Sequence, residues 1–280
     1  MSKNLLITLF AALAIAFLPA CGDDSPDNPT KPVNGFRPSY PHNITDAQKA
    51  VLDQLFQDMV TVEGGSFTMG ATADQGSDIT DHAKPAHKVS VDKFYICKYE
   101  VTEMLWAAVN NTSSASLLPK NNVSYTDVIS FIRKLQNMTS INFRLPTEAE
   151  WEFAARGGKK SNGYRYAGSN NANDVAWYLS NSGMTTHAVG SLAPNELGLY
   201  DMSGNVWELC SDWYGDFTSA SQTNPTGPAS GTYRVQRGGD GRVGERGVRI
   251  AIRDGILPNQ ADQWTGFRLV IDKSIYLEIN

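Results

Sequence analysis

Three cysteines, at positions 21, 97 and 210, are the residues of this 280-residue chain with the widest choice of chemistry. A cysteine can carry a lipid, form a disulfide, hold a soft metal ion or act as a nucleophile, and its surroundings decide which. No two of the three are separated by only two residues, which excludes a zinc ribbon, and three are too few for a disulfide-rich scaffold. Each cysteine is therefore interpreted from its own neighbourhood.

Cys21 ends a segment with the features of a secretory signal. Lys3 gives a positive start, an apolar stretch spans residues 5–18, and Leu18-Pro19-Ala20 directly precedes the cysteine. The stretch is shorter than the roughly 20 apolar residues of a membrane-spanning helix. The ending resembles a bacterial lipobox, which implies cleavage before Cys21 and its acylation. We therefore predict a signal peptide over residues 1–20 and lipidation at Cys21, with a soluble secretion signal or an uncleaved anchor as the alternatives.

Residues 21–42 are predicted to be the lipidated cysteine and a flexible tether, because Pro, Asp and Asn dominate and little apolar surface can offset the entropy of ordering. The acidic pair Asp23-Asp24 resembles sorting signals of Gram-negative lipoproteins. We thus expect an extracytoplasmic protein on the outer membrane, at its periplasmic or surface face.

The net charge excludes two kinds of binding. Removal of Lys3 with the signal peptide would leave a net charge of 23 − 29 = −6, so lipid rather than charge would hold the protein to the membrane. With no Lys/Arg block, nucleic acid is not expected as a partner.

Residues 43–280 are predicted to form a single domain, because no linker divides them and no repeat is evident. Capping residues predict helices that start after Thr45, Thr102, Ser124 and Thr147. Alternating apolar residues predict two strands joined by a tight turn at Gly64-Gly65, and one further strand over residues 88–96. Beyond residue 160 only short apolar clusters remain. These patterns predict a loop-rich α+β fold.

Six segments carry a family resemblance, and they occur in this order: residues 59–70, 94–102, 143–158, 195–208, 237–239 and 266–269. The longest contains Leu145-Pro146-Thr147-Glu148, and the last is Gly266-Phe267-Arg268-Leu269. Together they resemble the signature blocks of the formylglycine-generating enzymes, also called sulfatase-modifying factors. The resemblance covers about residues 58–272 and implies an α+β, loop-rich variant of the C-type lectin fold.

The resemblance also implies where oxidase chemistry would lie. The oxidases of this family use two copper-bound cysteines, placed between the Gly-Gly block and the final Gly-Phe-Arg. Here residues 240–253 contain no Cys, His or Met, whereas copper(I) prefers thiolate or thioether ligands. We therefore predict a pseudoenzyme with no catalytic residue and no copper. Cys97 and Cys210 are expected to be buried or paired in a disulfide, with a reactive pair as the alternative.

Residues 200–208 offer a second kind of chemistry. Asp201 and Glu208 supply carboxylate oxygens, and Gly204 and Val206 can supply main-chain oxygens, a donor set that suits calcium. Family members bind calcium at the corresponding positions, so the resemblance implies a structural calcium ion held by these four residues. In the alternative, Asp201 and Glu208 cap turns and pair with arginines.

The final loop is locally basic, because it contains Arg242, Arg246, Arg249 and Arg253. Its arginines are either paired internally or form an anion-binding face. From all these features we predict a membrane-anchored sulfatase-modifying-factor-like protein that acts as a non-oxidase binding or envelope-assembly module, with an envelope protein or a glycan as its partner. The alternative is a formylglycine-generating-type oxidase, or another enzyme acting in the same cleft.

Overall fold

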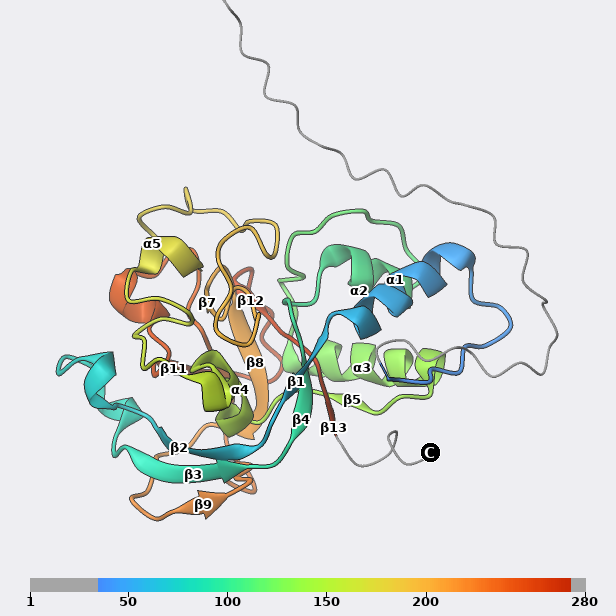
Figure 1. Ribbon diagram of the computed structural model, residues 1–280. Coiled ribbons are helices and arrows are strands. Elements are labelled where there is room, and N and C mark those ends of the chain that lie inside the picture. The colour runs from blue at the N-terminus through green and yellow to red at the C-terminus, as the bar shows by residue number, and fades with distance from the viewer. Residues whose placement is uncertain (1–34, 273–280) are drawn as a thin grey trace, which may run out of the picture. The chain divides into compact units, whose positions relative to one another are not determined.

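The computed structural model describes residues 35–272, so the predicted signal peptide, Cys21 and most of the tether lie outside the described residues. Its main helices begin at the predicted caps (Figure 1): α1 (Asp46–Gln57), α2 (Glu103–Val109), α3 (Tyr125–Thr139) and α4 (Glu148–Ala155). Thr45, Ser124 and Thr147 each form a capping box with the residue three positions later. After α4 the described helical segments are a single α-turn, α5 (Ala172–Val175), and short 3-10 turns, which confirms the expected lack of long helices.

The strands form small sheets rather than one large one. The first has the order β1 (Met59–Val62), β4 (Phe94–Cys97), β13 (Val270–Asp272) and β5 (Phe143–Arg144), with every neighbouring pair antiparallel. The second has the order β11 (Arg253–Ile256), β10 (Arg234–Arg237), β8 (Trp207–Trp213) and β12 (Thr265–Gly266). The third contains β2 (Gly65–Met69), β3 (His87–Val91) and β9 (Gln222–Thr223), and β6 (Ala176–Trp177) pairs with β7 (Ser203–Gly204). All described elements lie in one compact unit.

The hairpin predicted at Gly64-Gly65 is wrong, although both of its strands exist. β1 pairs with β4, and β2 pairs with β3, so the chain passes from one sheet to another at Gly64. The single strand expected over residues 88–96 is likewise divided at Asp92-Lys93. A Cβ on Gly64 would lie 2.6 Å from the carbonyl carbon of Asp92. The backbone at Gly64, between β1 and β2, therefore touches the backbone at Asp92, between β3 and β4. Glycine is needed there for close approach rather than for a hairpin turn.

The folded domain also begins earlier than the predicted boundary at residue 43. Phe36 is only 3% exposed, and its ring packs on Phe56 at 5.6 Å and on Tyr95 at 5.0 Å. The Tyr40 hydroxyl donates a 2.6 Å hydrogen bond to Asp53 of α1. Two aromatic side chains thus bind this segment to the domain, despite the polar composition of the residues before it.

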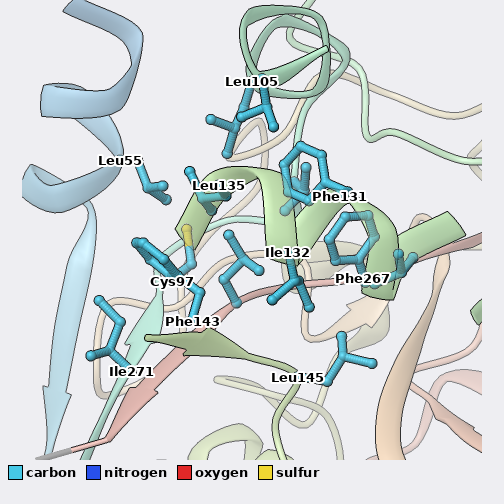
Figure 2. Packing of buried hydrophobic residues seen from close by; sticks show 14 of the residues in the cluster. Leu55, Cys97, Leu105, Phe131, Ile132, Leu135, Phe143, Leu145, Phe267 and Ile271 are labelled. Carbon is cyan, nitrogen blue, oxygen red and sulfur yellow. The ribbon is translucent and has the colours of Figure 1, made fainter. Parts of the chain in front are cut away.

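Two large apolar clusters form the core. In the first, α1, α2 and α3 pack against the β1–β4–β13–β5 sheet, and Figure 2 shows Cys97 of β4 there near Leu55, Leu135 and Phe143. The second gathers around Trp151 of α4, beneath β2, β3, β8 and β10, and contains Cys210. Among residues 35–272 there is no helix with the length and apolar character needed to cross a membrane.

Candidate functional site

The loop in which the family resemblance predicts that oxidase cysteines would lie connects β10 to β11 and contains a 3-10 turn, Glu245–Val248. Gly239, with φ +78°, folds the loop onto itself, since a Cβ there would lie 2.5 Å from the Gly247 carbonyl oxygen. Val248 is fully buried in a small apolar cluster, and Val243 packs against the same cluster. Apolar side chains therefore fill the interior of the loop.

The arginines of this segment are paired with carboxylates. The pairs, with their shortest N···O distances, are Arg242–Asp240 at 2.7 Å, Arg249–Asp78 at 2.6 Å and Arg253–Glu148 at 2.5 Å. Arg246 is also within 3.7 Å of Asp78. The pairs of Arg242, Arg249 and Arg253 agree with the internally paired alternative, and an anion-binding face stays a prediction.

Cys97 and Cys210 are free thiols, both buried, and they belong to different core clusters. The disulfide alternative is therefore wrong and the buried one is confirmed. Burial raises the pKa of Cys97 to about 11, and burial together with the nearby Asp212 carboxylate raises the pKa of Cys210 well above its ordinary value. Because the thiolate is the reactive form, neither residue is prepared for nucleophilic or redox chemistry at neutral pH.

The backbone of the Asp201–Glu208 segment is tightly turned, and it brings Asp201 and Glu208 into the same buried cluster. Asp201, Gly204 and Asn205 all have positive φ, at +58°, +83° and +63°. A Cβ on Gly204 would lie 2.2 Å from the Trp177 carbonyl oxygen, so only glycine fits beside β6. The result is a buried cluster in which Asp201 and Glu208 are joined by a third carboxylate, Glu100.

Glu208 is fully engaged by protein donors. Arg268 donates to both of its oxygens, at 2.5 and 2.6 Å, and the Trp151 indole N–H donates a third bond at 2.7 Å. Arg268 also donates to the main-chain oxygens of Cys97 and Tyr200. Glu208 thus follows the predicted alternative of pairing with an arginine, which leaves little of its carboxylate available to an ion.

Asp201 and Glu100 lack such a cation of their own. Asp201 accepts a hydrogen bond from the Gly190 N–H at 2.7 Å, and Glu100 accepts one from the Asn205 side chain at 2.7 Å. Burial raises the pKa of Asp201 to about 6, and burial with the neighbouring carboxylates raises the pKa of Glu100 well above its ordinary value. If all three carboxylates were ionised, one guanidinium would not balance their negative charge.

The described side chains nowhere place three His, Cys, Asp or Glu residues as a ready metal site. Calcium in this cluster would therefore depend on main-chain oxygens, such as those predicted from Gly204 and Val206, together with Asp201. Glu100, Arg268 and Trp151 were missed as members of the cluster. All three lie within the resembling segments, yet nothing in their spacing shows that they converge on Glu208.

A mixed α+β fold with small sheets, joined by long loops and closed by a buried Gly-Phe-Arg segment, defines the formylglycine-generating-enzyme-like class. The chain belongs to the sulfatase-modifying factor enzyme 1-like domain family, whose model matches residues 45–273. It is 31% identical over 236 residues to the chaperone protein LppX of Paenibacillus barcinonensis, which covers 65% of this chain and 78% of the relative. It is 30% identical to the formylglycine-generating enzyme of Mus musculus, with 76% of this chain and 75% of the enzyme covered. The solved structure of Treponema denticola variable protein 1 aligns with a TM-score of 0.67 and 30% identity, over 76% of this chain and 94% of that one.

Proposed function

We propose that this protein is a lipid-anchored, extracytoplasmic member of the family that binds and assembles an envelope protein rather than oxidising cysteine. The observation that carries the proposal is the loop between β10 and β11, which contains no cysteine and whose side chains include buried or packed valines and paired arginines. The similarity to a protein named a chaperone supports a protein as the partner. A glycan is the alternative partner, since the fold is a variant of the C-type lectin fold.

The absence of oxidase activity is directly testable. We expect no formylglycine when the protein is incubated with copper(I), oxygen and a Cys-Xaa-Pro-Xaa-Arg peptide, because both thiols of the domain are buried and apart. Mass spectrometry of the peptide gives the result, and the mouse formylglycine-generating enzyme serves as the positive control. Peptide that loses the mass of the conversion at a rate proportional to the protein added would replace this proposal with the oxidase alternative.

The lipid anchor is tested by Cys21→Ala. We expect the wild-type chain in the membrane fraction and labelled by a clickable palmitate analogue, and the variant unlabelled and released from the membrane. Cys97→Ala is the matched control, because Cys97 is buried in the domain and cannot accept a lipid there. Equal membrane retention and labelling of both variants would reject Cys21 as the attachment site.

We also propose that calcium binds the Asp201 cluster as a structural ion, through Asp201 and the main-chain oxygens of Gly204 and Val206, with Glu208 beside it. Calcium at 100 times its Kd would stabilise the fold by about 2.7 kcal/mol. We therefore expect a chelator to lower the Tm by several degrees, and calcium to restore it, as followed by differential scanning calorimetry.

The matched variants for the calcium proposal are Asp201→Asn and Asp46→Asn. Asp201→Asn removes the ligand charge and should abolish the chelator effect, whereas Asp46 is exposed on α1 and its replacement should leave the effect intact. A wild-type Tm that does not respond to chelation and readdition of calcium would rule out a structural calcium ion.

A further inference from the structure

A pocket of about 530 Å³ lies at the end of β8 and includes no residue of the Asp201 cluster. Its walls come from the ends of β2, β3, β8 and β9, the start of α4, Arg253 of β11, and the loop segments that follow β8. Glu148, Asp212 and Arg253 form its buried polar wall, and Trp213, Phe217 and Pro228 contribute apolar surface. Its volume lies within the range of pockets that hold small organic ligands.

The charges around this pocket are almost balanced before Asp212 is counted. Three arginines face three carboxylates in a connected network, through the pairs Arg253–Glu148, Arg237–Glu152 and Arg156–Asp74, with cross-links Arg237–Glu148 and Arg156–Glu152. Arg253 is the one permanent cation in the pocket wall, and Glu148 binds it at both oxygens. Asp212, and the exposed Asp216 at the rim, are therefore the carboxylates of the wall without an arginine.

Asp212 is only 3% exposed, and one of its oxygens is free to receive a ligand. Oδ2 accepts the Glu148 N–H at 3.1 Å and the Ser211 hydroxyl at 3.0 Å, while Oδ1 accepts no hydrogen bond from the described residues. Gly227, another wall residue, lies against it: a Cβ there would be 3.2 Å from Oδ1 and would cover it. Because the residue is glycine, the oxygen stays open to the pocket.

We infer that this pocket binds a small organic amine, whose ammonium group donates to Asp212 Oδ1 and whose apolar body lies along Phe217, Trp213 and Pro228. The ammonium supplies the hydrogen-bond donor that Asp212 Oδ1 lacks and the positive charge that balances the Asp212 carboxylate. A buried carboxylate that pairs with a cation and is hydrogen-bonded is far less costly than an unpaired one. The inference does not depend on the proposed function, because it uses neither the missing thiols of the β10–β11 loop nor a protein partner; Arg253 takes part only as the cation paired with Glu148.

The electrostatic surroundings of Asp212 agree with this inference. Burial and the negative charge of Glu148 raise the pKa of Asp212 to about 7. Without a ligand the carboxyl is thus largely protonated below neutral pH, and an ammonium that binds it favours the ionised form. Amine affinity should consequently be highest above pH 7 and fall as the pH drops.

Three probes of equal length separate the head groups: n-hexylamine, n-hexanol and hexanoate. Each is titrated by calorimetry into the full chain in a mild detergent at pH 8, below the critical concentration at which the probe itself aggregates. We expect saturable binding of hexylamine, with hexanol and hexanoate at least tenfold weaker. Hexanol or hexanoate that binds as tightly as the amine would overturn the assignment, as would a lack of saturable hexylamine binding.

The variant that tests the contact is Asp212→Asn, which keeps the shape of the side chain and removes its charge. We expect at least a tenfold loss of hexylamine affinity, against no change in Asp46→Asn, which removes the same charge from exposed α1. Unchanged affinity in Asp212→Asn would refute the role of Asp212.

A pH series on the wild-type chain keeps the test decisive even if Asp212→Asn fails to fold. The charged and titratable groups around Asp212 come from every element packed against it: Glu148 and Glu150 of α4, Cys210 of β8, Tyr125 of α3, Arg253 of β11, His87 of β3 and Asp216 after β8. Hexylamine affinity should fall about tenfold between pH 8 and pH 6, and His87→Gln should preserve most of this fall. Affinity that is independent of pH over this range would contradict binding at Asp212.

Discussion

Arg268→Met should lower the free energy of unfolding by about 3–5 kcal/mol, the cost typical of removing one partner from a buried ion pair. The guanidinium is fully buried and binds both oxygens of Glu208, which is also fully buried. Its loss leaves the carboxylates of Glu208, Glu100 and Asp201 without their guanidinium, and removes the donor to the main-chain oxygens of Cys97 and Tyr200. Chemical denaturation followed by circular dichroism measures the loss.

Lys93→Met is the matched control for Arg268→Met, because it removes a cation from an exposed ion pair with Glu63. Such pairs contribute about 0–1 kcal/mol, so we expect little change. Arg268→Met combined with Glu208→Leu should recover part of the lost stability, since no unpaired partner then remains in that pair. Equal effects of Arg268→Met and Lys93→Met would mean that the buried pair does not stabilise the fold.

Phe131→Ala is expected to cost a similar amount, about 3–5 kcal/mol, for a different reason. Phe131 is 1% exposed; its ring stacks on Trp106 at 4.9 Å and meets Phe267 edge to face at 5.5 Å. Its removal opens a cavity where α2, α3 and the Gly-Phe-Arg segment meet (Figure 2). The change in unfolding free energy, again from chemical denaturation, tests this value.

Leu257→Ala provides the comparison for Phe131→Ala, because Leu257 is 44% exposed. We expect it to change the stability by no more than about 0.5 kcal/mol. If Phe131→Ala proved as mild as Leu257→Ala, the three-ring contact would not be a central part of the core.

The helices were predictable because their signals are local. A capping residue, its partner three positions later and an apolar face all lie within a few residues, and the helices after Thr45, Ser124 and Thr147 begin where these signals place them. Strand pairing was less predictable, since it depends on distant segments. Gly64-Gly65 has the composition of a hairpin turn, but contact with Asp92 places its two flanking strands in different sheets.

In the candidate sites too, local features could be predicted from the sequence and contacts between distant segments could not. That residues 240–253 contain no thiol is visible in the sequence, and so is the turn-forming composition of residues 201–205. The pairing of Glu208 with Arg268, 60 residues later, is not visible, because it requires the register of β8 against β12. The Asp212 pocket is hidden for a similar reason: three arginine–carboxylate pairs between distant segments satisfy one another and leave Asp212 as the buried carboxylate without an arginine.

The position of β13 between β4 and β5 affects the order in which the sheet can form during folding. The last described strand is an inner strand of its sheet, so β5 has no neighbour in that sheet until residues 270–272 are available. Closing a chain segment of this length costs entropy before any contact repays it, and domains dominated by such distant pairings fold slowly. A fragment that stops before residue 270 would therefore lack both the β13–β4 and the β13–β5 pairing, and its first sheet would remain incomplete.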